Sequence, residues 1–313
     1  MDSIMAMTTS TRMSMDTKGS SVASDAPHPN PPHPWGGSQH TLATAEDKST
    51  KASLPHAAPS SPPPPRGGGR EGEPHAPRLP PSPKARNPAP QLAMMWLSSP
   101  ALPVGGFSYS EGLEAAVDAG LVTDEAQTLA WLRGQLQFTL ARSELPAACA
   151  AHAAWEAADS AALQTIQAWV LATRETFELR QQSQQMGRSM LEWLRNLRPA
   201  HPALPLAGQL EPAPAWPLAF ALGGLALGLD AEQMAHALAF SWLENQVQAA
   251  MRVVPLGQSS GQRLLAALLP DIPAAVEQAR NLQDRMDDWQ SFSPLLAILS
   301  SRHETQYSRL FRS

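Results

Sequence analysis

Apolar residues recur every three or four positions along residues 92–313, a spacing typical of helices that bury one face. No stretch alternates apolar and polar residues in the way of a half-buried strand. Residues 218–229 are apolar on every side, which predicts a helix that is buried all round. The pattern therefore predicts an all-α fold, a single-domain helical bundle of about nine or ten helices.

One predicted helix, which follows Asp230, carries polar side chains in unusual places. Asp230 is the expected N-terminal cap. Asn245 falls in line with the apolar residues of the helix, where a core side chain is expected. On a second face Glu244, Gln248 and Arg252 follow one another at four-residue steps, so Gln248 can bridge the two charged residues.

A second long helical pattern begins near Ser160 and continues, or restarts, through residues 172–197. Its apolar face includes Phe177, which predicts that this ring is packed, and Gly187, which lets a neighbouring helix approach closely. The opposite face is polar and is typical of a solvated surface. Its residues are Arg174, Glu178, Gln181, Gln185 and Arg188.

The apolar segment 92–104 ends in two glycines, and a helix is predicted to follow it. Ser108 and Glu111 stand three residues apart, which matches a capping box in which each side chain bonds the free amide of the other residue. Ser108 and Ser110 lack the G-x-S-x-G pattern and a preceding strand, so we do not predict a nucleophile here.

Composition divides the chain near residue 91. Of the 31 prolines, 18 lie before Gln91, and so do all the lysines. Such a segment buries too little apolar surface to offset its ordering entropy, so residues 1–91 are predicted to be a disordered Pro/Ser/Gly-rich tail. Two alternatives stay open, a transit peptide and a mis-assigned start with Met94 or Met95 as the true initiator.

Residues 92–313 contain no recognisable catalytic constellation. A P-loop needs a lysine after its glycines and a Schiff base needs a lysine amine, but no lysine follows Lys84. His152 and Glu156 are one helical turn apart and could share a metal ion, although such a pair is more often a surface hydrogen bond. His236 is expected to be a packed core histidine.

Charge and cysteine content narrow the class of protein further. Residues 92–313 carry 14 arginines against 21 acidic residues, which argues against a nucleic-acid-binding surface. The single cysteine, Cys149, allows no internal disulfide and fits a reducing, cytoplasmic location. No apolar run reaches the roughly 20 residues of a membrane-spanning helix.

The last residues of the sequence combine aromatic, aliphatic and arginine side chains. A frayed terminus is the ordinary expectation, but tyrosine and arginine beside large apolar residues are the side chains that anchor interfaces. We therefore predict that residues 302–313 form a partner-docking segment. Its candidate contact residues are Arg302, His303, Glu304, Tyr307, Arg309, Leu310, Phe311 and Arg312.

Four blocks of sequence resemble a known family. They are SPALPVGGFSYSEGLE from Ser99, RETFELRQQSQQMGRS from Arg174, ENQVQAAMRVVPLGQSSGQRLL from Glu244 and SSRHETQYSRLFRS from Ser300. In this order they resemble urease accessory proteins of the UreF family, over essentially all of residues 92–313. The proline-rich tail has no counterpart in the family pattern.

The resemblance implies an all-α homodimer that is not an enzyme and that acts as a chaperone for nickel insertion into urease. Family members join a UreD-type protein (also called UreH) and the UreG-type GTPase on apo-urease. GTP is then bound by the partner, nickel is handled transiently by the complex, and no cofactor or metal is bound stably. The resemblance also implies that residues 302–312 order on the UreD-type partner.

Two more sets of residues are implied by the resemblance. One set is similar to a dimer and GTPase-facing region and comprises Gly105, Phe107, Tyr109 and Glu111. Family members are also thought to provide a water-filled passage for nickel. Candidate lining residues, which structural hydrogen bonding would explain equally well, are Asn245, Gln248, Arg252 and Gln258.

Two other functions stay open beside the adaptor. The chain could regulate the turnover of the GTPase by supplying an arginine to its active site. A helical metalloenzyme or hydrolase that uses His152, Glu156 or His236 is the more distant alternative.

Overall fold

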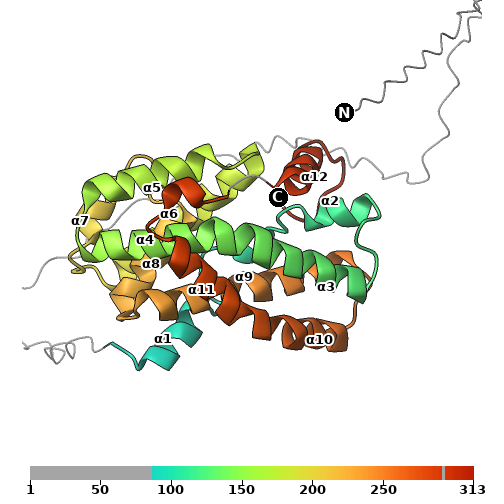
Figure 1. The fold of residues 1–313 in the computed structure, drawn as a ribbon, viewed down its shortest axis with the longest axis horizontal. Helices are drawn as coiled ribbons and strands as arrows, with labels where there is room; N and C mark the ends of the chain where they lie inside the picture. The colour runs from blue at the N-terminus through green and yellow to red at the C-terminus, as the bar shows by residue number, and fades with distance from the viewer. Residues whose placement is uncertain (1–86, 291–292) are drawn as a thin grey trace, which may run out of the picture. The chain divides into compact units, whose positions relative to one another are not determined.

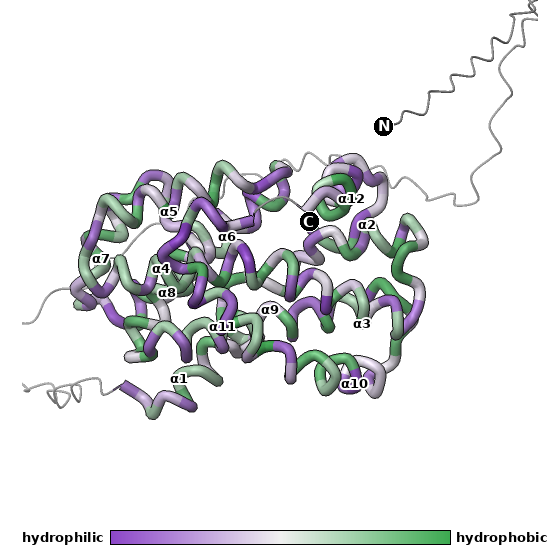
Figure 2. Tube along the Cα trace, in the orientation of Figure 1, coloured by the Kyte–Doolittle hydropathy of each residue, from purple (hydrophilic) through white to green (hydrophobic). Residues whose placement is uncertain are grey.

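Helices make up the part of the chain that the computed structural model describes, residues 87–290 and 293–313 (Figure 1). In this part there are twelve α-helices and no strand, and ten of the helices have eight residues or more. The predicted all-α class and number of helices are confirmed. Hydrophobic and hydrophilic residues follow one another along the helices, as the sequence pattern predicts (Figure 2). The prediction of a disordered tail falls almost wholly on residues 1–86, which lie outside the described residues.

The α-helices are α1 (Pro90–Leu97), α2 (Leu113–Asp118), α3 (Glu125–Gly134), α4 (Glu144–Glu156), α5 (Ser160–Ala172), α6 (Phe177–Leu197), α7 (Leu204–Ala207), α8 (Trp216–Leu227), α9 (Ala231–Val253), α10 (Gln258–Leu268), α11 (Ile272–Leu282) and α12 (Pro294–Glu304). Short turns lie between them, namely the 3₁₀ turns η1 (Gly106–Ser108), η3 (Leu140–Arg142), η4 (Leu269–Asp271) and η5 (Met286–Asp288) and the π-turn η2 (Gln135–Thr139).

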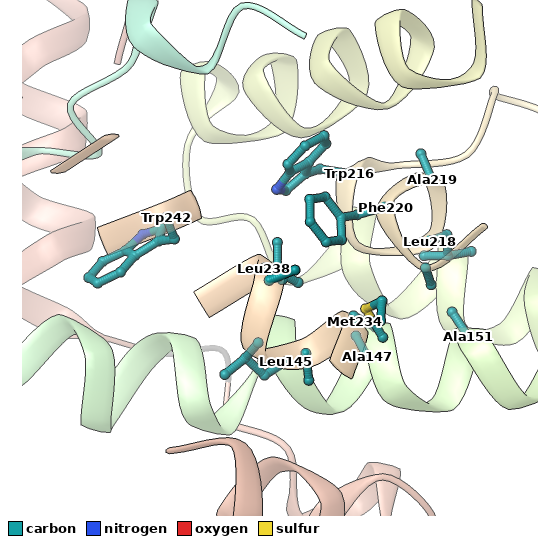
Figure 3. Packing of buried hydrophobic residues seen from close by; sticks show 14 of the residues in the cluster. Leu145, Ala147, Ala151, Trp216, Leu218, Ala219, Phe220, Met234, Leu238 and Trp242 are labelled. Atoms are coloured by element: carbon teal, nitrogen blue, oxygen red, sulfur yellow. The ribbon is translucent and has the colours of Figure 1, made fainter. Parts of the chain in front are cut away.

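Helix α8 lies at the centre of the core, and α4, α6 and α9 pack around it. Nearly all its residues are buried, as the apolar run at residues 218–229 predicted. Figure 3 shows its side chains meeting those of α9, with Phe220 from α8 beside Leu238 and Met234 from α9. The rings of Trp216 and Phe220 meet edge to face, with centroids 5.1 Å apart.

Helix α9 contacts α1, α4, α8, α10 and α11, so it connects both ends of the bundle. Asp230 caps it as predicted: the side chain accepts the Gln233 amide, and the Gln233 side chain accepts the Asp230 amide. Residues 230–253 therefore form the long helix that the sequence pattern predicts.

Helix α6 confirms one prediction about its faces and contradicts another. A Cβ atom on Gly187 would lie 2.0 Å from the Pro214 carbonyl oxygen, so the close approach exists, although the neighbour is the segment before α8 and not a helix. Phe177 was predicted to be packed, but 64% of it is exposed, and Glu178 is buried instead. The reason is that α12 covers the side of α6 on which Glu178 lies.

The predicted capping box of Ser108 and Glu111 is wrong. Helix α2 begins at Leu113, behind Gly112 with φ of +79°, and Ser108 belongs to the preceding turn η1. Glu111 has φ of +51° and sends its carboxyl group inward to Trp242 and Gln182. Burial of that carboxyl group therefore overrides the local capping pattern.

Candidate functional site: a polar junction under the C-terminal segment

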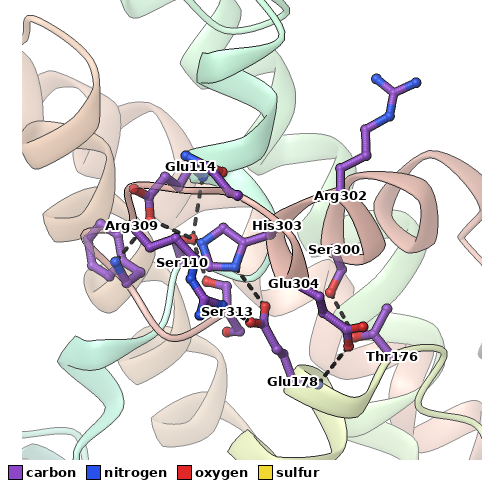
Figure 4. A network of polar contacts seen from close by, with 12 residues as sticks. Ser110, Glu114, Thr176, Glu178, Ser300, Arg302, His303, Glu304, Arg309 and Ser313 are labelled. Atoms are coloured by element: carbon purple, nitrogen blue, oxygen red, sulfur yellow. Dashed lines mark hydrogen bonds and ion pairs between the residues drawn. The ribbon is translucent and has the colours of Figure 1, made fainter.

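The C-terminal segment, residues 302–313, folds back over α2 and α6 (Figure 4). Its contacts come from three of the four sequence blocks of the resemblance, those that begin at Ser99, Arg174 and Glu244. Polar side chains, most of them buried, meet where it packs on the domain, and we call this set the polar junction. It comprises Ser110, Glu111, Glu114, Glu178, Gln182, His303 and Arg309.

His303, from the last turn of α12, lies at the centre of the junction and is 0% exposed. Its Nδ1 atom is 2.6 Å from a Glu178 carboxylate oxygen, and its Nε2 atom is 3.1 Å from a Glu114 carboxylate oxygen. The other oxygen of Glu178 accepts the guanidinium of Arg309. We call these four residues, Glu114, Glu178, His303 and Arg309, the His303 clamp.

The carboxylate of Glu114 also holds the main chain of the C-terminal segment. It accepts the amide of Leu310 at 2.7 Å and the amide of Phe311 at 2.9 Å. Phe311 is buried against α2 and α9, and the Arg252 guanidinium lies 5.8 Å from the centre of its ring. One buried acid therefore satisfies two main-chain amides of the segment, of which that of Phe311 is buried.

Further hydrogen bonds fasten α12 and the segment to the start of α6. Thr176, the N-cap of α6, shares a hydroxyl hydrogen bond of 2.7 Å with Ser300. A Glu304 carboxylate oxygen accepts the amide of Glu178 at 3.2 Å. An acid at this position is stabilised by the free amides and the positive end of the α6 dipole.

Ser110 binds the far end of the segment. Its amide and its hydroxyl both donate to the Ser313 carbonyl oxygen, at 2.8 and 2.6 Å. The Ser313 hydroxyl donates to the Gln182 side chain at 2.7 Å. Gln182 in turn donates to Glu111 at 2.6 Å, so an unbroken chain of hydrogen bonds runs from the segment to the interior.

Glu111 is the acid of the junction that lies between Gln182 and Trp242. One carboxylate oxygen accepts Gln182, and the other accepts the indole N–H of Trp242 at 2.8 Å. Burial, helped by the nearby charge of Glu144, raises the pKa of the Glu111 carboxyl group to about 7, although both hydrogen bonds and Arg174 act in the opposite direction. The left-handed backbone of Glu111 is a further cost, which persists because the inward contacts hold it.

Two small cavities flank Glu111, with volumes of about 40 and 20 Å³, and both are lined by Glu111, Gln182, Trp216 and Trp242. The larger one is also lined by the ion pair of Glu144 and Arg174. Each is large enough for water and is bounded by groups that hydrogen-bond to water. The junction can therefore hold hydrated polar groups inside a helical core.

Of the four residues predicted to line a passage, one lies at a cavity and three lie on the surface. Asn245 lines the smaller cavity, and its side chain lies so close to Gly106 that a Cβ atom there would be 2.6 Å from it. The other three residues are exposed and line neither cavity; they are Gln248, Arg252 and Gln258. Within the described part of the chain Gln248 makes no hydrogen bond to Arg252, so the expected bridge is not formed; it donates to Glu244 at 3.2 Å.

The residues of the predicted dimer and GTPase-facing region also differ in where their side chains point, some outward and some inward. Phe107 points outward and is 59% exposed, and its carbonyl oxygen accepts the Arg252 guanidinium at 3.3 Å. Tyr109 and Glu111 face inward. Gly105 has φ of +76°, a conformation that glycine adopts readily, and it begins the turn that presents Phe107.

The docking candidates in the C-terminal segment fall into an inner and an outer group. His303 and Phe311 are buried, and Arg309 reaches inward to Glu178. Tyr307 is fully exposed, and Leu310 is 64% exposed. The remaining exposed candidates are Arg302, Glu304 and Arg312.

Sequence reasoning missed Ser110, Glu114 and Gln182 as members of the site. Glu114 carried a usable signal, because it is a lone acid between Leu113 and a run of small apolar residues on a short helix. Gln182 carried none, since it is one of several glutamines in succession on α6.

The residues of the metalloenzyme alternative lie elsewhere. The His152 ring is buried, with Nε2 2.9 Å from the Leu229 carbonyl oxygen, while Glu156 is exposed. His236 is half-buried and bonds the Glu232 carbonyl oxygen, so it is not the core histidine that was predicted. Within residues 87–290 and 293–313, no group of three or more His, Cys, Asp or Glu side chains is placed to hold a metal ion.

No helix within the described part of the chain is both long enough and apolar enough to cross a membrane. This agrees with the sequence pattern, in which the most apolar helix, α8, has twelve residues.

Comparisons with known proteins give consistent likenesses. The family model named UreF matches residues 122–269. The urease accessory protein UreF of Methylibium petroleiphilum is 54% identical over 224 residues, which are 71% of this chain and 93% of that protein. The protein of the same name from Polaromonas sp. is 52% identical over 236 residues, 75% of this chain and all of that one. A bifunctional urease accessory protein UreEF of Bordetella bronchiseptica is 48% identical over 226 residues, 71% of this chain and 51% of that protein.

Proposed function

Because the chain belongs to the UreF family of urease accessory proteins, we propose that it acts in urease maturation as an adaptor that joins a UreD-type protein and the UreG-type GTPase on apo-urease. The family assigned from the four sequence blocks is thus confirmed. In this proposal the chain is a cytoplasmic homodimer without a catalytic site of its own. Nickel is cargo handled by the complex, and GTP is bound by the partner.

The C-terminal segment has an inner group of residues packed on the domain and an outer group left exposed. This arrangement supports the docking role and is the observation that carries the proposal. The inner residues hold the segment in place, and Tyr307 and Leu310 make no contribution to the core. On α12 the exposed residues Leu295, Ile298 and Arg302 recur at three- and four-residue steps and so share one face. Tyrosine and arginine are the side chains that most often anchor an interface, here for the UreD-type protein, and the exposed aliphatic groups add apolar surface beside them.

The interior of the junction supports a role in nickel handling. We propose that the passage runs past Glu111, Gln182 and Asn245, which line the two cavities. Carboxylate and amide oxygens can replace part of the water shell of a divalent cation. The exposed Phe107 and Arg252 form the surface that we assign to the dimer or the GTPase.

The first prediction separates docking from folding. We expect a chain with Tyr307→Ala and Leu310→Ala to bind the UreD-type protein about thirtyfold more weakly or worse, because truncation of a tyrosine anchor costs about 2 kcal/mol. Helical content and thermal midpoint, measured by circular dichroism, should not change, since both side chains are exposed. The matched control is Phe138→Ala, which removes another exposed aromatic ring, 63% accessible, away from the segment.

Retention of the UreD-type protein by the double variant at the level of the Phe138→Ala control would refute the docking role of the segment. The same proteins allow a test of the regulator alternative. An adaptor leaves the rate of GTP hydrolysis by the UreG-type protein unchanged, whereas an arginine supplied to its active site accelerates the reaction by orders of magnitude. A strong acceleration that Arg252→Ala removes would replace the adaptor with the regulator.

A further inference from the structure

We propose that the His303 clamp is a proton-dependent latch, which holds the C-terminal segment on the domain while the His303 ring is doubly protonated and releases it when the ring loses a proton. The inference concerns this chain alone. It holds whether or not the segment docks on a partner, and its test uses no partner.

The geometry of the ring carries the inference. Both ring nitrogens of His303 face carboxylate oxygens, at 2.6 Å on Glu178 and at 3.1 Å on Glu114 (Figure 4). A carboxylate only accepts hydrogen bonds, and a neutral imidazole donates from one nitrogen alone. With both acids ionised, both contacts are hydrogen bonds only in the imidazolium form. In the neutral form one nitrogen lone pair faces a carboxylate oxygen.

Burial makes this conflict difficult to relieve. His303 is 0% exposed, so no solvent reaches the ring to replace a lost hydrogen bond while the segment stays in place. The carboxylates are fixed as well. Glu114 is tied to the amides of Leu310 and Phe311, and Glu178 is tied to Arg309. Movement of α12 and the segment is the change that brings water to the unpaired groups.

The charges around the ring balance only when it is protonated. Helix α2 contributes Glu114 and α6 contributes Glu178, while the segment contributes Arg309 and α12 contributes the ring itself. Two carboxylates then face two cations. Two more charged groups lie at the edges: Glu304 accepts the Glu178 amide, and Arg252 of α9 lies over the Phe311 ring. Loss of the ring proton leaves an uncompensated negative charge in a buried site.

The consequence is that segment order falls as pH rises. Release exposes Phe311, the two clamp carboxylates and the hydrogen-bonding groups of Ser110 and Gln182 together, because all of them are covered by the same segment.

The experiment is hydrogen–deuterium exchange of the full chain at a series of pH values from about 5.5 to about 8.5, read at a peptide that contains Leu310 and Phe311 and corrected for intrinsic exchange. We expect the protection of these amides to fall by about tenfold or more across the series. In His303→Gln, which is neutral throughout, protection should be low and independent of pH. In His236→Gln, which removes a half-buried histidine on α9, the wild-type response should remain.

Protection that is constant across the series in the wild-type chain would overturn the proposal, and so would a pH response that persists in His303→Gln. If His303→Gln does not fold, Glu114→Gln tests the same proposal. It removes one of the two negative partners of the ring, so the midpoint of release should move to lower pH. An unmoved midpoint contradicts the latch.

Discussion

Glu111 occupies a left-handed backbone conformation, with φ of +51°, and places its carboxyl group between Trp242 and Gln182. Both features are unfavourable for a glutamate taken by itself. They persist because each carboxylate oxygen accepts a hydrogen bond inside the domain. At the scale of the residue, the protonation of Glu111 is therefore set by its neighbours in the polar junction.

The raised pKa of the Glu111 carboxyl group should make the free energy of unfolding depend on pH. The pKa of the Glu111 carboxyl group is raised from 4.5 to about 7, so the folded state binds more protons than the unfolded state between these values. Its contribution is fully present below pH 4.5 and is lost as pH rises through about 7. In Glu111→Gln, urea unfolding should lack this decline, which is of the order of 3 kcal/mol.

Exposed Glu156 provides the control for this experiment, because Glu156→Gln removes an acid with no contact to the junction. We expect that variant to follow the wild-type pH dependence. The contrary result is a free energy of unfolding that changes with pH in Glu111→Gln as it does in the wild type. It would show that the pKa of the Glu111 carboxyl group is not raised.

At the scale of elements, α6 joins the core to the junction. Its inner side packs on α8, with Gly187 against Pro214 and the Ser183 hydroxyl accepting the Trp216 amide at 3.2 Å. Its N-terminal turn holds Glu178 under α12. A single helix of 21 residues therefore joins these two contacts.

Gly187→Ala should separate α6 from the segment before α8. The added Cβ atom would lie 2.0 Å from the Pro214 carbonyl oxygen, and backbone must shift to admit it. We expect a loss of about 3 kcal/mol in the free energy of unfolding. The control is Gly134→Ala at the end of α3, where nothing lies within 4 Å and alanine should stabilise by up to about 1 kcal/mol. Equal stability of the two variants would contradict the close approach.

At the scale of the whole molecule, residues near both ends of the described chain contact α9. Helix α1 packs on α8 and α9, and the Ser98 hydroxyl donates to the Ala237 carbonyl oxygen at 3.1 Å. The far end of the chain reaches α9 through Phe311 and Arg252. Stability of the domain therefore depends on segments that lie more than 200 residues apart in the sequence.

Two truncated chains test the contribution of α1. A chain that begins at Asn87 keeps the whole helix, whereas one that begins at Met95 loses the fully buried Ala93 and the first turn that supports Leu97. We expect the shorter chain to be less stable by about 2 kcal/mol in urea unfolding. If both chains unfold at the same urea concentration, α1 is not part of the cooperative core.

Much of the fold could be read from local patterns. The apolar run of α8, the cap at Asp230 and the glycine at the close approach of α6 are each written within a few neighbouring residues. The side of α6 that is buried could not be read in this way. Glu178 looks like a surface acid until α12 covers it, and Phe177 looks like a core residue until its neighbours leave it exposed.

The sequence by itself determined the helical class, the main helices and the family, because helix periodicity and motif blocks are properties of residues close together along the chain. Only the tertiary structure decided which polar residues meet. His303 and Glu114 are 189 residues apart, and their contact depends on how α2, α6 and α12 pack as whole helices. The same packing turns a sequence of scattered acids, glutamines and one histidine into a single buried junction, since the energy of each group depends on the partners that burial gives it.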